Sequence, residues 1–167
     1  EIVPMIESAK GVHFCYEILT ASPRVSSVIA GSAQDGDLQT DMGAEWSPEG
    51  IEILYARSKI LMSARAAGIG QPLDGVFPGL DDEEALLLDC RNARRLGYRG
   101  KTVIHPKQIE PVHRVFSPSD DEIAHYRDMI AAYDQAEAEG SGAINFRGKM
   151  IDRAMVRKAR GLLERFG

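Results

Sequence analysis

Two stretches near the start of the chain decide the fold: Ile2-Val3-Pro4-Met5-Ile6-Glu7-Ser8 and, further on, Gly31-Ser32-Ala33-Gln34-Asp35-Gly36-Asp37-Leu38. Each places an acidic residue where a short apolar run ends. Buried strands that end in carboxylates are typical of an α/β barrel, whose catalytic loops gather at the carboxyl ends of its strands. The two stretches therefore predict a metal site at the carboxyl edge of a parallel sheet.

Strand-like and helix-like segments alternate through the first two thirds of the sequence. Proline and glycine signals bound several of them, such as Ser47-Pro48-Glu49 at the start of one predicted helix and Gly97 at the end of another. Four strand–helix units with crossovers of this length can be half of an eightfold barrel or part of an open doubly wound sheet. The predicted strands are residues 2–6, 25–30, 73–77 and 101–106, and the predicted helices are 9–19, 47–67 and 82–96.

Two segments depart from this alternation. The polar, glycine-punctuated stretch 31–43 is predicted to be a long functional loop. Beyond Phe116 the sequence predicts an appended element, with a capped helix up to residue 139, an extended piece over 144–150 and a final helix over 151–166. Within helix 47–67 an apolar stripe is predicted to be buried, and Arg57 is predicted to face away from it.

Composition excludes several classes of function. A formal net charge of −5 argues against a nucleic-acid-binding surface, and the apolar runs are far shorter than a membrane span. The cysteines Cys15 and Cys90 lack metal or redox spacing, so a reducing, cytoplasmic compartment is expected. At 167 residues the chain is shorter than a complete eightfold barrel, and we expect it to be the carboxyl part of a longer protein.

Glu7 and Asp37 are the leading candidates for metal ligands because they follow consecutive strands. Either acid alone is more often an ion-pair partner or a helix cap. The second loop also contains Asp35 and Asp41, and chemistry alone does not choose among its three acids. A site built only from oxygen donors favours Mg²⁺ or Mn²⁺ over Zn²⁺.

Two further residues have a structural and a functional interpretation. His105 ends the last predicted strand, where it is either a general base or a histidine that hydrogen-bonds a neighbouring loop. Asp152 is either the N-cap of the final helix or a group that transfers a proton when a Gly-hinged tail closes over the site. Both roles of Asp152 can coexist.

Seven short blocks spread over the whole chain resemble the citrate lyase β subunit-like family of the HpcH/HpaI aldolase superfamily. Their order along the chain is that of the family, which makes the set more specific than any one block. The blocks are Met5-Ile6-Glu7-Ser8-Ala9-Lys10-Gly11, Ala21-Ser22-Pro23-Arg24-Val25, Asp37-Leu38 with Asp41-Met42-Gly43, Tyr55-Ala56-Arg57, Ala64-Arg65-Ala66-Ala67-Gly68-Ile69, Gly97-Tyr98-Arg99-Gly100-Lys101 with Ile104-His105-Pro106-Lys107-Gln108-Ile109, and Gly148-Lys149-Met150-Ile151-Asp152.

The resemblance implies a TIM-type (β/α)8 barrel, of which residues 1–116 are the C-terminal part and residues 117–167 a helical C-terminal lid. It implies a lyase that cleaves or forms carbon–carbon bonds in CoA thioesters such as malyl-CoA or citramalyl-CoA. It also implies a homotrimer, in which Glu7 and Asp37 bind Mg²⁺ and Asp152 enters the active site of a neighbouring protomer. Among the three loop acids, the family pattern selects Asp37.

Two departures from the family pattern affect these expectations. The stretch between Gly31 and Asp37 is longer than in relatives, and the first four strands, which carry a substrate-contacting arginine in the family, have no counterpart here. The chain as printed is therefore expected to lack part of its site. A citrate lyase β subunit acting on an acyl-carrier-protein thioester, a thioester hydrolase and a non-catalytic scaffold of the same fold remain as alternatives.

Overall fold

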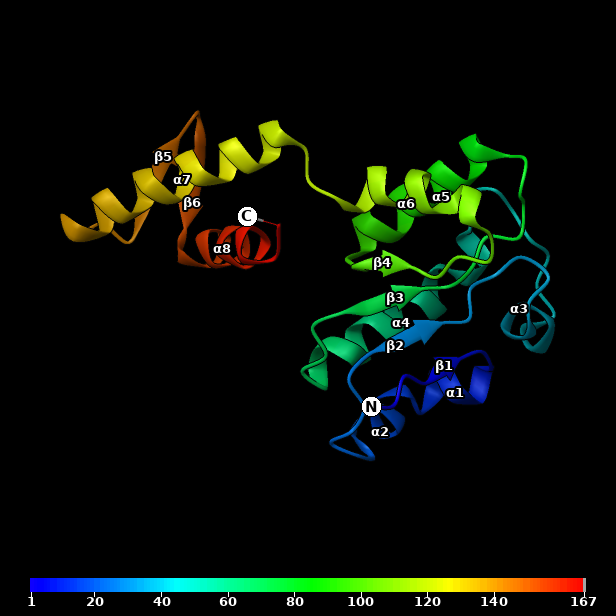
Figure 1. The fold of residues 1–167 in the computed structure, drawn as a ribbon. Coiled ribbons are helices and arrows are strands. Elements are labelled where there is room, and N and C mark those ends of the chain that lie inside the picture. The colour runs from blue at the N-terminus through cyan, green and yellow to red at the C-terminus, as the bar shows by residue number, and fades with distance from the viewer. Residues whose placement is uncertain (167) are drawn as a thin grey trace. The chain divides into compact units, whose positions relative to one another are not determined.

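Four short strands form a parallel sheet in the order β1-β2-β3-β4 (Figure 1). The computed structural model describes residues 1–166, with side chains described as far as Glu164. The chain divides into two compact units, the first ending at Phe116 and the second beginning at Ser117. The sheet confirms the predicted α/β class. Its strands are β1 Met5–Ile6, β2 Val28–Ala30, β3 Pro72–Asp74 and β4 Gly100–Lys101.

The two faces of this sheet differ in burial. The paired residues Ile6 and Ala30 lie on a face that is covered by helices and are buried. The pairing also places Met5, Ile29, Leu73 and Gly100 in one row across the opposite face. Met5 is 48% exposed there, and Ile29 and Leu73 are only partly buried. The first unit thus leaves an apolar sheet face partly open.

The helix predicted over 9–19 is divided into α1 Ala9–His13 and α2 Cys15–Thr20. The break is at Phe14, whose φ of −98° and ψ of 23° leave the helical region. Position 14 holds neither proline nor glycine, and the apolar periodicity continues across it. The sequence therefore contains no signal of this break. Val12, Cys15 and Leu19 are nevertheless all buried, as the periodicity predicts.

The predicted loop 31–43 contains a helix, α3 Asp37–Met42. Gly36 caps its start, and Gly43 ends it in a left-handed conformation with φ of 65°. Within the loop, Gln39 accepts a hydrogen bond from the Asp35 N–H at 2.8 Å and donates to the Ala44 carbonyl at 3.0 Å. The prediction of an irregular loop was therefore wrong for its second half, which forms a short helix between Gly36 and Gly43.

The long helix α4 Ile51–Ala66 begins later than predicted. Ser47 instead belongs to a turn, in which its carbonyl accepts from the Gly50 N–H at 3.0 Å and its hydroxyl donates to Glu52 at 2.7 Å. Gly50 has a φ of 66°, a left-handed conformation that separates the turn from the helix. The prediction that a helix begins at Ser47-Pro48-Glu49 was therefore wrong, because these residues form a turn before the helix.

Beyond α4 the first unit contains the two short strands β3 and β4, loops, and three further helical segments. Helix α5 Glu83–Leu96 is capped by the Asp82 side chain and ends at Gly97, close to its predicted bounds. The predicted strand over 101–106 is limited to β4, and the chain continues into the 3-10 helix η1 Pro106–Gln108 and helix α6 Ile109–Phe116. The proline starts the 3-10 helix because its fixed φ suits a first helical turn.

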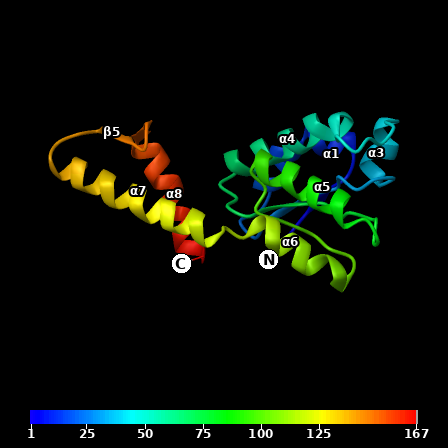
Figure 2. The same ribbon diagram turned by 90° about the horizontal axis from the view of Figure 1, so that it is seen from above.

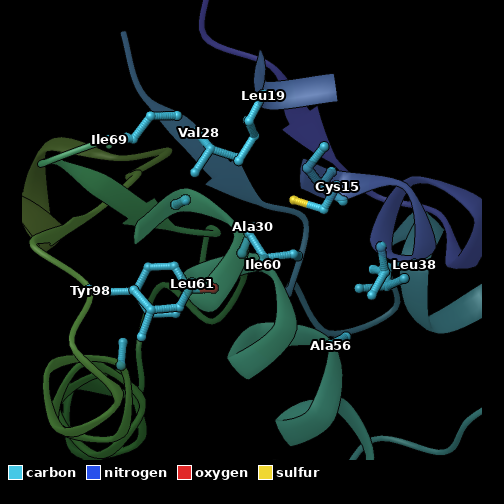
Figure 3. Packing of buried hydrophobic residues seen from close by; sticks show 14 residues of the cluster. Cys15, Leu19, Val28, Ala30, Leu38, Ala56, Ile60, Leu61, Ile69 and Tyr98 are labelled. Atoms are coloured by element: carbon cyan, nitrogen blue, oxygen red, sulfur yellow. The ribbon is translucent and has the colours of Figure 1, made fainter. Parts of the chain in front are cut away.

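The main hydrophobic core lies between the sheet and helices α2, α3 and α4 (Figures 2 and 3). Leu38 of α3 is fully buried in it, which anchors the loop that follows β2. Other core side chains, seen in Figure 3, are Cys15, Leu19, Val28, Ala30, Ala56, Ile60, Leu61, Ile69 and Tyr98. A second cluster joins α5 to α6.

The second unit pairs two helices with a β-hairpin. Helix α7 Asp120–Ala138 starts with a capping box of Ser119 and Glu122, and helix α8 spans Arg153–Phe166. The predicted extended piece is an antiparallel hairpin of β5 Ala143–Phe146 and β6 Lys149–Asp152. Its turn residues Arg147 and Gly148 have φ of 50° and 80°, the signs that a tight hairpin turn requires. The core residues of this unit are Met129, Tyr133, Ile151, Val156 and Ala159.

No helix among residues 1–166 has the length and apolar character needed to cross a membrane.

The close approach of β1 and β2 allows only glycine at position 31. A Cβ atom added to Gly31 would lie 2.4 Å from the Glu7 Cβ and 2.8 Å from the Glu7 Cα. We expect Gly31→Ala to push the two strand ends apart and lower the free energy of unfolding by about 1–3 kcal/mol. Urea unfolding measures this loss. Gly70→Ala is the control, because an added Cβ there meets no atom within 4 Å. Equal urea midpoints for the two variants would contradict the prediction.

Candidate metal site at the carboxyl edge of the sheet

The carboxyl ends of the four parallel strands bring several polar residues to one edge of the sheet. Glu7 directly follows β1, Ser32 follows β2 by two positions, and Asp74 and Lys101 are the last residues of β3 and β4. Because the strands are parallel, all four exits lie at the same edge. This edge is where ligands of α/β proteins bind.

Glu7 and Asp37, the predicted metal ligands, are both exposed. Glu7 lies against Gly31, and Asp37 is the first residue of α3, the helix toward which β2 leads in Figure 1. Among the described residues, neither carboxylate takes part in a hydrogen bond or an ion pair. Both are therefore free to bind a cation.

The other acids of the loop differ from Asp37. Asp41 is occupied, because its Oδ2 accepts a hydrogen bond from the Ala9 N–H at 2.7 Å. Asp35 is exposed and has a left-handed backbone, with φ of 56°, but its side chain has no partner in the described part of the chain. The structure thus removes Asp41 from the free ligands that the sequence left open.

The donors present suit a hard divalent cation. Within residues 1–166 no group of three or more His, Cys, Asp or Glu side chains is arranged to hold a metal ion. A pair of carboxylates is the protein contribution that Mg²⁺ commonly uses, since it keeps several waters and takes further oxygens from substrate. The residues present therefore fit Mg²⁺ and do not fit a closed zinc site.

Behind this edge lies a buried ion cluster that the sequence analysis missed. Asp74 is 0% exposed and accepts hydrogen bonds from Arg57 Nε at 3.0 Å and Lys101 Nζ at 2.7 Å. Asp89 pairs with the same two cations, through Arg57 at 3.0 Å and through Lys101. The prediction that Arg57 faces away from the buried stripe was wrong, because two carboxylates neutralise it inside.

The cluster also fixes the start of the loop that carries Asp37. The Ser32 hydroxyl donates to Asp74 Oδ1 at 2.9 Å and accepts from the Gly75 N–H at 3.3 Å. These bonds join the exits of β2 and β3. The spacing of Arg57, four residues after buried Ile53 and four before Leu61, was the signal that could have placed it inside.

Burial and charge act in opposite directions on these groups. Burial by itself would raise the pKa of the Asp74 carboxyl, but the positive charges of Lys101 and Arg57 outweigh it and hold that pKa well below its usual value. Burial would lower the pKa of Lys101, and the charges of Asp74 and Asp89 raise it instead. Asp74 and Lys101 are therefore both held in their charged forms around neutral pH.

The remaining candidates have local structural roles. His105 Nδ1 accepts a hydrogen bond from the Lys107 N–H at 3.1 Å and caps η1. Asp152, in the second unit, ends β6, and its Oδ1 accepts from the Met155 N–H at 3.0 Å at the start of α8. The N-cap interpretation of Asp152 is thus confirmed, and its proton-transfer role stays a prediction.

A model of the HpcH/HpaI aldolase/citrate lyase family matches residues 1–106, which include β1 to β4. The chain belongs to this family. The resemblance predicted from the seven sequence blocks is confirmed. The matched range contains Glu7, Asp37 and the whole ion cluster.

Named members of the family lie at moderate identity. The citrate lyase subunit beta of Leuconostoc mesenteroides subsp. cremoris is 43% identical over 159 residues, which are 95% of this chain and 51% of the relative. The mitochondrial citramalyl-CoA lyase of Mus musculus is 34% identical over 167 residues, 97% of this chain and 49% of the relative. The chain thus spans about half the length of the curated relatives it matches.

A solved structure matches the entire chain. CitE from Mycobacterium tuberculosis, in complex with magnesium, acetoacetate and coenzyme A, superposes with a TM-score of 0.81 at 28% identity. The match covers 100% of this chain and 61% of that protein. The α/β architecture of the family is therefore present here.

Proposed function

We propose that the complete protein is a Mg²⁺-dependent carbon–carbon lyase. It cleaves or forms a hydroxyacyl-CoA thioester such as malyl-CoA or citramalyl-CoA, with acetyl-CoA and a 2-keto acid as the other side of the reaction. The observation that carries the proposal is the pair of unpartnered carboxylates, Glu7 and Asp37, that follow neighbouring strands. The relatives support it, since they include named lyases and a structure with magnesium and coenzyme A.

Residues 1–116 form the C-terminal half of a (β/α)8 barrel in this proposal. Parallel sheets are normally buried on both faces, yet Met5, Ile29 and Leu73 are partly exposed on one face of this sheet. A second set of strands closing a barrel would cover that row as its interior. The matched relatives are about twice as long, which leaves room for those strands.

Glu7 and Asp37 would hold the ion through their carboxylate oxygens. When bound, Mg²⁺ supplies Lewis-acid stabilisation of negative charge on the oxygens of the 2-keto acid. Asp152 holds or moves the proton at the methyl carbon of acetyl-CoA: the carboxylate removes it in condensation, and the carboxylic acid returns it in cleavage. The thioester enolate needs a positive or N–H donor environment, which we assign to the other half of the barrel.

The proposal includes a homotrimer in which residues 117–167 act as a lid. Asp152 would then serve the metal site of a neighbouring protomer. Two features support this: Asp152 belongs to a unit with a hydrophobic core of its own, and the hairpin leading to it turns at Gly148. Closure of such a lid would exclude water from the enolate.

The test is an assay of the complete protein with malyl-CoA and citramalyl-CoA, with and without Mg²⁺. We expect a 2-keto acid and acetyl-CoA to form in equal amounts and a chelator to stop the reaction. Keto acid is measured as its hydrazone and acetyl-CoA by chromatography. If neither substrate yields a keto acid, the proposed lyase function is contradicted.

Metal titration tests the ligand assignment separately. We expect Glu7→Ala to weaken Mg²⁺ binding at least about tenfold, because one of two protein ligands is lost. Isothermal titration calorimetry measures the affinity. Glu17→Ala, which removes another exposed glutamate of the first unit, is the control. Unchanged Mg²⁺ affinity in Glu7→Ala would remove Glu7 from the site.

A second candidate is a citrate lyase β subunit that acts on an acyl-carrier-protein thioester. The 43% identity with the Leuconostoc subunit favours it. Co-purification with an acyl carrier protein, and turnover only with its thioester, would select this function over the CoA-dependent lyase. Release of free CoA without a keto acid would indicate a hydrolase, and a complete protein that binds no Mg²⁺ would indicate a scaffold.

A further inference from the structure

A long-range hydrogen bond joins the helix that carries Asp37 to the segment that follows Glu7. The Asp41 carboxylate, in the last turn of α3, accepts a hydrogen bond from the Ala9 N–H at 2.7 Å across 32 positions of sequence. Ala9 is the first residue of α1 and lies two positions after Glu7. The contact therefore ties α3 to the exit of β1.

Asp37 and Asp41 are four residues apart in this helix and so lie on the same face, with Cβ atoms about 5–6 Å apart. The face that Asp41 turns toward Ala9 is consequently the face that presents Asp37. Buried Leu38 and the Gln39 contacts with Asp35 and Ala44 hold α3 as one piece. Fixing Asp41 thus fixes the direction of the Asp37 side chain.

The two aspartates also repel each other, because like charges at this spacing destabilise a helix. Among the described residues, no cation pairs with either of them. The Ala9 N–H is the partner that Asp41 has in this arrangement. A divalent ion bound at Asp37 would reduce the repulsion between the two carboxylates. Metal binding at Asp37 and the hydrogen bond from Ala9 to Asp41 are therefore coupled.

We propose that Asp41 is a positioning residue that orients Asp37 toward Glu7 through its hydrogen bond to the Ala9 N–H. It acts through Asp37 and is not itself a metal ligand. The inference rests on the proposed Mg²⁺ site. It assigns a role to a second acid of the loop that the sequence pattern could not separate from the ligand.

Three variants of the complete protein test it. Asp41→Ala removes the hydrogen-bond acceptor, whereas Asp41→Asn removes the charge and keeps an oxygen that can accept from Ala9. Asp35→Asn removes the charge of a loop acid whose side chain has no partner among the described residues, and asparagine tolerates its left-handed backbone. Each variant is checked for folding by its thermal midpoint, and its Mg²⁺ affinity is measured by calorimetry.

We expect Asp41→Ala to weaken Mg²⁺ binding about 10- to 100-fold, the range typical of residues that orient metal ligands. Its Ala9 amide should also exchange with deuterium faster than in the wild type. Asp41→Asn should stay within about threefold of the wild type in both measurements, and Asp35→Asn should match the wild type.

Two results would overturn the positioning role of Asp41 without affecting the proposed function. One is wild-type Mg²⁺ affinity in Asp41→Ala. The other is an Asp41→Asn variant as weak as Asp41→Ala, which would mean that the charge of Asp41, or its direct ligation of the ion, is what matters. A wild-type protein that binds no Mg²⁺ would overturn the proposed function and this inference together.

Discussion

Asp152→Asn is expected to lower turnover of the complete protein by about 10²- to 10⁴-fold, the contribution typical of a positioned general acid or base. The amide cannot take up or return the proton at the methyl carbon of acetyl-CoA. It can still accept the hydrogen bond from the Met155 N–H, because asparagine caps helices about as well as aspartate. Steady-state kinetics should therefore show a lower kcat with unchanged Mg²⁺ affinity.

Asp128→Asn is the matched control for this variant. Asp128 lies in the same unit and pairs with Arg147 at 2.7 Å on the surface, where such a pair contributes little to stability. Its replacement should leave turnover unchanged. Near-normal turnover in Asp152→Asn would remove Asp152 from the mechanism and leave it with its capping role alone.

Mixed oligomers test whether Asp152 serves a neighbouring protomer. Asp152→Asn protomers retain the metal ligands, and Glu7→Ala protomers retain Asp152, so each variant alone is expected to be nearly inactive. If Asp152 enters the adjacent site, co-expression of the two should restore turnover in part. If the mixture stays as inactive as its components, Asp152 acts within its own protomer or not at all.

Lys101→Met is expected to lower the free energy of unfolding of the first unit by about 3–5 kcal/mol, as is usual when one partner of a buried ion pair is removed. Methionine keeps much of the side-chain volume, so the loss reports the charge. Among the described residues, fully buried Asp74 would then pair with Arg57 alone, and Asp89 would depend on the same guanidinium. Urea unfolding followed by circular dichroism measures the change.

Lys107→Met is the control, because Lys107 pairs with Asp81 at 3.6 Å and both side chains are largely exposed. Its loss should cost less than about 1 kcal/mol. Destabilisation of similar size in both variants would show that the buried cluster contributes no more than a surface pair.

The effect of Lys101→Met should depend on pH in a defined way. The depressed pKa of Asp74 means that its contribution is complete above about pH 4 and is lost as pH falls below that value. The raised pKa of Lys101 means that its contribution is complete below about pH 10 and is lost as pH rises further. The stability difference between wild type and variant should therefore be constant between these limits.

The sequence alone was sufficient for the alternation of strands and helices in the first unit and for the class of the fold. Strand-length apolar runs separated by capped, periodic helices encode a parallel α/β arrangement, because periodicity and capping are local properties of the chain. Glu7 and Asp37 were predicted as metal ligands from their places after the first two strands, and that role stays a prediction. Their exposed, unpaired state agrees with the role that the sequence predicted for them.

Only the tertiary structure decided which charges are buried and which acids are free. Arg57 and Asp74 are 17 positions apart, Lys101 and Asp74 are 27, and Asp41 and Ala9 are 32. No local pattern encodes such pairs, since an ion pair or a long-range hydrogen bond depends on distance in space and on burial. The sequence names the acids of the loop, but only the fold shows that Asp41 binds a backbone N–H while Asp37 has no partner among the described residues.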